Sequence, residues 1–319
     1  GGKDKGLRMK DKDGKGKIIK LKAFAKINLF LEVTRRRPDG YHELATLFAR
    51  IGVNDRLSFQ KIDAPGVRLL VKGGPRGCEA QFIKNRLGRP ADNIVFRAAV
   101  KFFEVFGITP AVEIRLEKNI PVGAGLGGGS SDAAAALLGL ARLYKLTRCA
   151  SGRLMKIAAV MGSDVPFFML DTRMAEGVGR GEKLKVLKPV AGLPYIVLVY
   201  PGVPVYTKEV YGSLRLGAGP DILRRLRNFR KLRGLIKNGG FTAGLSGLLF
   251  NRLEEFVFPR HKAVRLAKER LAALGAETTL MSGSGASVFA LCRSRDKAAR
   301  IAAEMERIRS YRVFLTKFC

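Results

Sequence analysis

One stretch of this sequence has the composition of an anion-binding loop. Residues 121–131 are Pro-Val-Gly-Ala-Gly-Leu-Gly-Gly-Gly-Ser-Ser, and they connect an expected strand to an expected Ala/Leu-rich helix that begins at Ser131 or Asp132. Glycine lets the backbone approach an anion closely and adopt positive φ at low cost. The free N–H groups at a helix start favour negative charge, and Ser130 and Ser131 add hydroxyl donors. This segment, the glycine loop, is therefore predicted to bind phosphate.

Two other interpretations of the glycine loop compete with phosphate binding. Gly123-x-Gly125-x-x-Gly128 matches a dinucleotide fingerprint, but no Asp or Glu occurs between Asp132 and Asp164, where that fingerprint needs an acid. A flexible linker would not run directly into an Ala/Leu-rich helix. A P-loop is excluded because no Gly-Lys-Ser/Thr follows the glycines. The context favours phosphate binding.

Asp164 and Lys26 are the candidates for proton transfer and charge stabilisation. Asp164 lies among apolar residues in Gly-Ser-Asp-Val-Pro-Phe-Phe, where a carboxylate could take a proton from a hydroxyl, or could equally cap a helix or a turn. Lys26 lies among apolar residues of an expected strand, a costly place for an unpaired cation. There it could stabilise a transferring phosphoryl group. Asp164 is its expected partner, and Asn28 lies on the same strand face.

Strands and helices alternate irregularly around these residues, which favours an α+β fold. Asp92 is the expected cap of the first helix and Gly107 its end. A second glycine-rich turn is expected within residues 278–291. The expected strands cover residues 18–30, 44–59, 112–116, 195–200 and 312–318, and the expected helices cover residues 93–106, 131–144, 153–161, 221–237, 261–274 and 296–309.

Four segments in order along the chain resemble the GHMP kinase superfamily of small-molecule kinases. The glycine loop resembles its second motif, residues 280–290 (Leu-Met-Ser-Gly-Ser-Gly-Ala-Ser-Val-Phe-Ala) its third, and residues 162–168 its catalytic-aspartate segment. Residues 23–31 (Ala-Phe-Ala-Lys-Ile-Asn-Leu-Phe-Leu), followed by 37–44 (Arg-Pro-Asp-Gly-Tyr-His-Glu-Leu), are similar to the amino-terminal signature of one family within it. The resemblance covers about residues 21 to 319.

The resemblance implies a two-domain α+β kinase with its active site in the cleft between the domains. The implied division is a basic tail over residues 1–20, an ATP-binding and catalytic domain over 21–180, and a C-terminal domain over 181–319. The implied reaction is ATP-dependent phosphorylation of the 2-hydroxyl of 4-diphosphocytidyl-2-C-methyl-D-erythritol, a step towards isoprenoid precursors. Lys26 and Asp164 would be its catalytic residues.

The same resemblance implies the ligand-binding residues. The ATP site would comprise Pro121, Val122, Gly123, Ala124, Gly125, Leu126, Gly127, Gly128, Gly129, Ser130 and Ser131, with Asn93 and Lys118 near adenine or ribose. The cytidine-diphosphate-linked substrate would contact Asn28, Tyr41, His42, Thr207 and Tyr211, with Tyr206 as the rival of Tyr211. Magnesium is expected because phosphoryl transfer needs charge neutralisation. Asp132 or Ser131 could help to hold it, but no ligand set is assigned.

The charge of the chain is extreme, at +32 from 59 basic and 27 acidic residues. Lys and Arg are spread along the whole chain without a nucleic-acid-binding motif, so nucleic-acid binding is not expected as the main function. No apolar run reaches the length of a membrane span. The four separated cysteines are expected to be free thiols, typical of a reducing compartment. We expect a monomer or homodimer in the cytoplasm, or in a plastid stroma if a transit peptide was removed.

Overall fold

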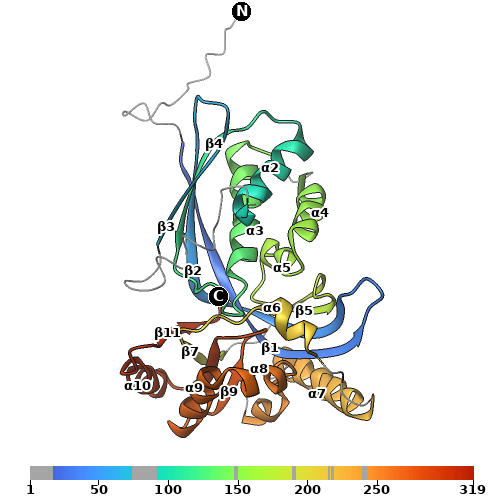
Figure 1. The fold of residues 1–319 in the computed structure, drawn as a ribbon, viewed down its shortest axis with the longest axis vertical. Helices are drawn as coiled ribbons and strands as arrows, with labels where there is room; N and C mark the ends of the chain where they lie inside the picture. Colours follow the sequence, from blue (N-terminus) through green and yellow to red (C-terminus); the bar gives the residue numbers. More distant parts are fainter. Residues whose placement is uncertain are drawn as a thin grey trace, which may run out of the picture.

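The computed structural model describes residues 17–73, 92–146, 150–188, 192–214, 216, 219–238 and 243–319. Within them the chain forms one mixed and one antiparallel β-sheet with helices packed against them, which confirms the expected α+β class (Figure 1). The first sheet has the order β3-β4-β2-β1-β8, with β5 paired to β2 and β6 to β5. Its strands are β1 (Ile19–Arg36), β2 (His42–Lys61), β3 (Gly66–Gly73), β4 (Ala111–Lys118), β5 (Met174–Gly179), β6 (Lys183–Leu187) and β8 (Phe250–Asn251).

The second sheet has the order β11-β7-β10-β9, and all its pairings are antiparallel. Its strands are β7 (Tyr195–Tyr200), β9 (Thr278–Met281), β10 (Val288–Cys292) and β11 (Arg312–Lys317). The helices that accompany it are α7 (Gly219–Asn238), α8 (Glu254–Arg260), α9 (Lys262–Ala273) and α10 (Arg295–Glu306), with the 3-10 helix η3 (Ala243–Leu248). These elements occupy the lower part of the molecule in Figure 1.

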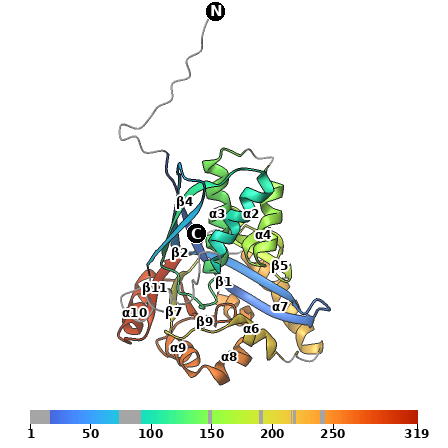
Figure 2. The same cartoon turned by 45° about the horizontal axis from the view of Figure 1, so that its top comes forward.

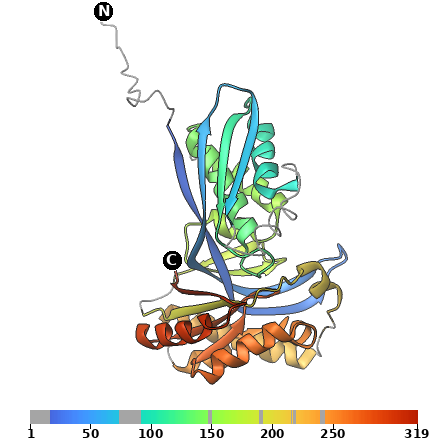
Figure 3. The same ribbon diagram turned by 60° about the vertical axis from the view of Figure 1, so that its left-hand side comes forward.

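The β1–β2 hairpin joins the two parts of the molecule. Its antiparallel register runs from Ile19 opposite Phe59 to Arg36 opposite His42. Both strands, blue in Figure 3, pass from the upper part into the lower part. Strands β1 and β2 have 18 and 20 residues, which is far longer than the usual five or six. The hairpin therefore carries side chains from one sheet to the other along one continuous backbone.

Helices α2 (Ile94–Phe106), α3 (Gly128–Leu143), α4 (Ser151–Met161) and α5 (Val165–Met169) cover one face of the upper sheet (Figure 2). The Ala-rich face of α3 lets this helix approach the strands closely. A Cβ on Gly139 would lie only 2.3 Å from the ring of Phe59, so any side chain there would push α3 away. Close packing of α3 in turn fixes the helix start, which lies at the end of the glycine loop.

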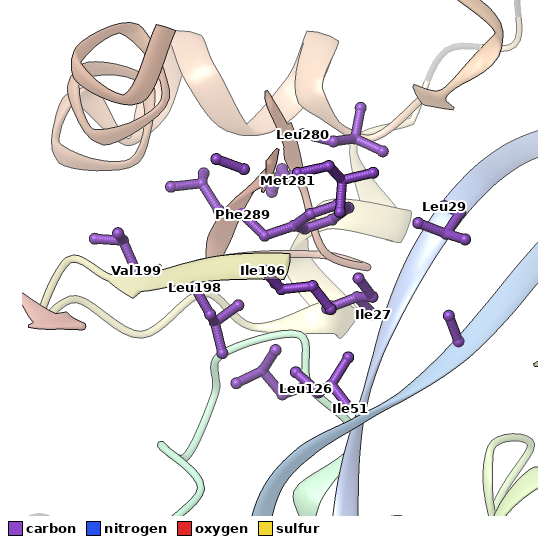
Figure 4. Close-up of a cluster of buried hydrophobic side chains, with 14 of the residues drawn as sticks. Ile27, Leu29, Ile51, Leu126, Ile196, Leu198, Val199, Leu280, Met281 and Phe289 are labelled. Atoms are coloured by element: carbon purple, nitrogen blue, oxygen red, sulfur yellow. The ribbon is translucent and has the colours of Figure 1, made fainter. Parts of the chain in front are cut away.

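The lower core ties the glycine loop to both sheets. Figure 4 shows Leu126 beside Ile51 of β2 and Leu198 of β7, with Ile27 of β1 nearby. All four side chains belong to one buried cluster and are almost fully removed from water. Burying a leucine side chain contributes about 1.5–3 kcal/mol. Leu126 is thus the apolar anchor of an otherwise small-residue loop.

The observed element bounds correct several of the expected ones. Helix α2 is capped by Asn93 and not by Asp92: the Asn93 side chain accepts a hydrogen bond from the Val95 N–H at 2.8 Å. Gly107 ends it as expected, at φ +62°. Helix α3 begins at Gly128, before Ser131 or Asp132. Strands β3, β5 and β6 and helices α5, α8 and α6 (Thr207–Gly212) were not anticipated.

Strand pairing crosses the expected domain boundary at residue 180. Strand β6 pairs with β5 from beyond that residue, and the short β8 pairs with β1. The division into residues 21–180 and 181–319 stays a prediction, and most of the expected tail lies outside the described residues. In the part of the chain that the structure describes, no helix has the length and apolar character needed to cross a bilayer. Cys292 and Cys319 are free thiols, whereas Cys78 and Cys149 lie outside the described residues.

Candidate active site

A cavity of about 1000 Å³ lies between the glycine loop, the β1–β2 hairpin, and helices α5 and α6. It gathers nearly every site residue expected from the sequence, although these residues lie as far apart along the chain as Lys26 and Tyr211. Ser131 is the exception, since it is buried in the first turn of α3 and does not line the cavity. Tyr206, the rival of Tyr211, is not part of the lining either. The lining includes Lys26, Asn28, Tyr41, His42, Asn93, Lys118, Pro121, Val122, Gly123, Ala124, Gly125, Leu126, Gly127, Gly128, Gly129, Ser130, Asp164, Thr207 and Tyr211.

The glycine loop has a backbone shaped for an anion. Gly123, Gly125 and Gly127 have φ of +67°, +72° and +67°, while the residues between them keep negative φ. Alternation of this kind turns successive N–H groups towards one concave side, which is the geometry of an anion-binding nest. A Cβ on Gly125 would lie 2.1 Å from the carbonyl oxygen of Ser282, so no other residue fits there.

The carbonyl groups of the glycine loop are held by the surrounding protein. Four consecutive carbonyls accept hydrogen bonds from other segments, whereas the N–H groups of Gly125, Leu126 and Gly127 donate to none of the described residues. The loop therefore presents unsatisfied donors to the cavity, which is what a phosphate requires. The pairs are Gly123 O with Val205 N at 3.0 Å, Ala124 O with Ser287 N at 3.1 Å, Gly125 O with Lys26 Nζ at 3.1 Å and Ser282 Oγ at 3.0 Å, and Leu126 O with Lys26 N at 2.9 Å.

Helix α3 starts directly after this loop. Its N-cap is Gly127, which supplies no side-chain cap, so the first N–H groups of the helix stay available. The positive end of the helix dipole then lies at the same place as the nest. Both features favour a polyanion at the end of the loop.

Lys26 lies at the junction between the glycine loop and Asp164. Its ammonium group donates to Asn28 Oδ1 at 2.8 Å and to the Gly125 carbonyl at 3.1 Å. The Asp164 carboxylate lies 3.5 Å away. Since an ammonium group has three donors, two are occupied by neutral acceptors and the third is left for Asp164 or a ligand. The expected pair of Lys26 and Asp164 is therefore present as an ion pair that is longer than a hydrogen bond of ordinary length.

Asp164 occupies the N-cap position of α5, yet its side chain accepts no hydrogen bond from that helix. This geometry argues against the alternative that Asp164 is a structural cap. Its side chain is 30% exposed, on the cavity side. The carboxylate is thus positioned by α5 and open to a ligand.

Asn28 is held in one orientation by a second polar contact. Its side-chain N–H₂ group donates to Thr46 Oγ1 at 2.8 Å, and the Thr46 hydroxyl donates to the Phe30 carbonyl at 2.8 Å. This chain fixes the amide so that its oxygen faces Lys26. Thr46 was not anticipated, because a threonine in a strand gives no sequence signal of this role.

Below the loop, Lys118 is enclosed by two carboxylates. Its ammonium donates to Asp55 Oδ2, and to Asp132 Oδ2 at 2.7 Å, and all three side chains are almost fully buried. Burial opposes the charged form of Lys118, but the carboxylates outweigh it and raise its pKa. Burial raises the pKa of Asp132 well above its usual range despite the nearby Lys118. These three residues form the buried triad.

Asp55 also fixes the entry to the glycine loop. Its second oxygen accepts hydrogen bonds from the backbone N–H groups of Asn119 and Ile120. Asp55 was missed by sequence reasoning, although a charged residue at an inward position of a strand was a usable signal. Lys118 was predicted to lie near adenine or ribose. It lines the cavity, but both of its side-chain hydrogen bonds go to Asp55 and Asp132.

Three aromatic side chains gather at the other end of the cavity. The rings of His42 and Tyr211 lie 5.4 Å apart at 38°, and Tyr41 is 54% exposed beside them in the lining. Burial, with a smaller effect of Arg36, lowers the pKa of His42. Its ring is therefore neutral at pH 7 and offers one donor and one acceptor. Burial and the nearby Asp164 raise the pKa of the Tyr211 hydroxyl, which stays protonated.

The turn before β10 closes the cavity beside the loop. Thr207 Oγ1 and Ser284 Oγ are hydrogen-bonded at 2.8 Å, which links α6 to this turn. Gly283 has φ +54°, and a Cβ there would lie 3.0 Å from the Gly125 carbonyl oxygen. The glycine-rich turn expected within residues 278–291 is thus present, and Gly283 packs directly against the glycine loop.

Models of known protein families match segments in both halves of the chain. A model of the GHMP kinases N terminal domain matches residues 93–172, and a model of the GHMP kinases C terminal region matches residues 226–309. A 4-diphosphocytidyl-2-C-methyl-D-erythritol kinase of Geobacter sulfurreducens is 39% identical over 296 residues, with 92% of this chain and 97% of that protein covered. The Syntrophus aciditrophicus enzyme of the same name is 36% identical, with 94% and 99% covered. A crystal structure of 4-(cytidine 5'-diphospho)-2C-methyl-D-erythritol kinase, 35% identical, matches with a TM-score of 0.72 over 94% of this chain and 100% of that chain.

Proposed function

The chain belongs to the 4-diphosphocytidyl-2-C-methyl-D-erythritol kinase family of GHMP kinases, and we propose that it transfers the γ-phosphoryl group of ATP to the 2-hydroxyl of that diphosphocytidyl alcohol, a step of the non-mevalonate route to isoprenoid precursors. The observation that carries this proposal is the position of Lys26. Its ammonium touches the glycine loop through Gly125 and lies 3.5 Å from Asp164. One cation thus connects the phosphate nest to the carboxylate.

The nucleotide binds with its phosphates in the glycine loop. Free N–H groups of the nest and of the first turn of α3 donate to the phosphate oxygens. Ser130 adds a hydroxyl, and Asn93 lines the side of the cavity where the base or ribose would lie. Phosphate binding by backbone groups positions the γ-phosphoryl group without a P-loop lysine.

Asp164 takes the proton of the acceptor hydroxyl as the new bond forms between the substrate oxygen and the γ-phosphorus. The bond from the γ-phosphorus to the bridging oxygen breaks at the same time, and ADP leaves with that electron pair. Lys26 stabilises the charge on the transferring group and keeps the carboxylate near the acceptor. Asn28, held by Thr46, offers its side chain to the substrate alcohol.

The aromatic end of the cavity receives the pyrimidine. Tyr41 and Tyr211 supply ring faces for stacking, and the neutral His42 supplies a donor and an acceptor for the edge of the base. Thr207 lines the same space. One cavity thus holds groups for a pyrimidine base together with a proton acceptor for an alcohol, which suits a nucleoside diphosphate joined to a small alcohol.

The residues at the loop fit a magnesium ion that is held mainly by phosphate and water. Mg²⁺ commonly binds one or two carboxylates together with substrate phosphates. Asp132 Oδ1 is buried without a hydrogen-bond partner among the described residues, and Asp132 lines the cavity. The residues that the structure describes contain no group of three Asp, Glu, His or Cys side chains that could hold a metal ion by themselves. Asp132 is therefore the proposed protein ligand, and the bound ion would neutralise phosphate charge. Asp132→Asn should reduce the gain in ADP affinity that Mg²⁺ brings, measured by calorimetry.

A coupled ADP-release assay with 4-diphosphocytidyl-2-C-methyl-D-erythritol tests the reaction. Turnover should depend on this alcohol, and Tyr41→Ala should raise its KM by about tenfold through loss of stacking while the KM for ATP changes little. Good turnover of homoserine or mevalonate without turnover of the diphosphocytidyl alcohol would move the chain to another branch of the superfamily. A cytoplasmic location and a monomeric or homodimeric state stay predictions.

A further inference from the structure

The turn between β5 and β6 carries an arginine into the cavity. Gly179 and Gly181 have φ of +73° and +103°, and they flank Arg180. The Arg180 backbone N–H donates to Glu182 Oε2 at 2.6 Å, and a Cβ on Gly179 would lie 2.9 Å from both oxygens of that carboxylate. The carboxylate of Glu182 is thus engaged with the backbone of the turn. The result is a fixed turn that holds Arg180 in the cavity lining.

The guanidinium of Arg180 has no carboxylate within 4.0 Å among the described residues. It lies instead over the ring of Tyr41, 4.8 Å from the ring centroid. Arg37 nearby differs, because it pairs with Asp39 at 3.0 Å and Glu43 at 3.0 Å. A guanidinium that stacks on a ring keeps its in-plane N–H donors free for an anion.

Other charges at this end of the cavity also favour an anion. Arg36 and Lys208 line it together with Arg180. Asp39 lies close enough for Arg180 to help lower its pKa, after the larger effect of the hydrogen bond from Arg37, but Asp39 is already paired with Arg37. A ligand whose base stacks on Tyr41 and whose alcohol reaches Asp164 must place its linking phosphates between them. The phosphates would then begin next to Tyr41, the residue on which Arg180 is stacked.

We propose that Arg180 is a substrate-binding residue whose guanidinium donates hydrogen bonds to the diphosphate of the cytidine-diphosphate-linked substrate while its flat face supports Tyr41. This inference depends on the proposed function, because it assigns a role within the same substrate site. It adds a recognition element for the linker to those for the base and the alcohol. Binding energy would then come from a charged contact that the nucleoside alone cannot make.

The test compares CDP with cytidine as ligands of wild type and Arg180→Gln. Calorimetric titrations are done with the ATP site filled by a non-hydrolysable ATP analogue, so that CDP reports only on the substrate site. Hydrogen bonds between charged groups are the stronger class, so R180Q should reduce the ratio of CDP affinity to cytidine affinity by about tenfold or more. Arg180→Lys keeps a point charge and should retain part of that ratio.

Arg153→Gln is the matched control, because Arg153 also stacks on a ring, 4.5 Å from the Phe106 centroid, but outside the cavity. It should leave both affinities unchanged. Equal weakening of CDP and cytidine binding in R180Q would leave the affinity ratio unchanged and would mean that Arg180 only supports Tyr41. This result would overturn the diphosphate contact, as would a variant in which neither affinity changes. A wild-type protein that neither binds CDP nor phosphorylates the diphosphocytidyl alcohol would overturn the proposed function, and this inference with it.

Discussion

Two lysines are buried beside the same cavity, and they are partnered in opposite ways. Lys118 lies between two carboxylates, Asp55 and Asp132, in the almost water-free triad. Lys26 has two neutral acceptors at hydrogen-bonding distance and one carboxylate at 3.5 Å, whose side chain is 30% exposed. Both hydrogen bonds of Lys118 go to buried carboxylates, so the protein neutralises its charge, whereas both hydrogen bonds of Lys26 go to neutral acceptors, so its charge stays available to a ligand.

The difference separates a structural cation, Lys118, from the proposed catalytic one, Lys26, by their partners alone. A buried charge pair that is complete adds little net stability, but the loss of one member leaves an uncompensated charge and is very costly. A loosely paired cation costs less to remove but matters to chemistry, because it can redirect its donors to a developing charge. Changes at the two sites should therefore affect different measurements.

The largest effect is expected at the loosely paired site. Asp164→Asn removes the proton acceptor and should lower kcat by about a thousandfold, roughly 4 kcal/mol. The variant should keep its ADP affinity within about twofold, since Asp164 does not touch the glycine loop. Asp171→Asn is the control, because Asp171 is a nearby, fully exposed aspartate. Steady-state kinetics and calorimetry measure both; a wild-type rate in D164N would show that another group is the base.

At the buried triad the effect should appear as lost stability. Lys118→Met leaves Asp55 and Asp132 buried together without their cation, and should lower the free energy of unfolding by about 3 kcal/mol. Urea denaturation measures this loss. Lys101→Met, at an exposed lysine paired with Glu104, should change the stability by less than about 1 kcal/mol. A similar loss in both variants would mean that the triad is not a special source of stability.

A substitution can also make the two lysines alike. Asn28→Asp would place a second carboxylate on Lys26, as Asp132 is placed on Lys118. The added charge should tie up Lys26, repel Asp164 and lower kcat by about tenfold. Asn28→Ala separates this effect from simple loss of the amide. Kinetics that are the same for N28D and N28A would contradict the idea that free donor capacity on Lys26 matters.

The smallest effect expected is a dependence of stability on alkaline pH. Although burial opposes it, the two carboxylates raise the pKa of Lys118 above its ordinary value of 10.5. The unfolded chain therefore loses this proton first, and the stabilisation is complete below about pH 10.5 and is lost as the pH rises further. Between pH 10 and 11 the change should be below about 1 kcal/mol. Urea denaturation at several pH values should show a weaker dependence in K118M than in wild type.

Sequence alone was sufficient where residue type and local spacing determine the chemistry. The glycine loop could be predicted because glycines, serines and a helix start act together within eleven residues. Lys26 stood out as a cation in an apolar strand, and the family resemblance pointed to Asp164. The distance of 3.5 Å between the Lys26 ammonium and the Asp164 carboxylate could not be predicted, because it depends on how α5 packs beside β1.

Sequence was insufficient where long-range packing overrides local preference. Glycine is a poor helix former, so the start of α3 at Gly128 could not be expected. The structure places Gly128 against Ile120, where a Cβ would lie 2.9 Å from that side chain. Asp55 reaches the site only because β2 brings it next to β4. Helix α5 was missed because five residues with a proline at the start are too short to show a period.

The contact between Gly125 and the turn at Ser282 and Gly283 limits how this enzyme can move and change. Each turn occupies the space in which a side chain of the other would lie, and Ser282 and Lys26 both hold the Gly125 carbonyl. The glycine loop and this turn are therefore packed together as one rigid unit. Any closure around the substrates has to come from elements outside it. Because the atoms that a Cβ on Gly125 would meet belong to the backbone, no substitution in the other turn could make room for a side chain there.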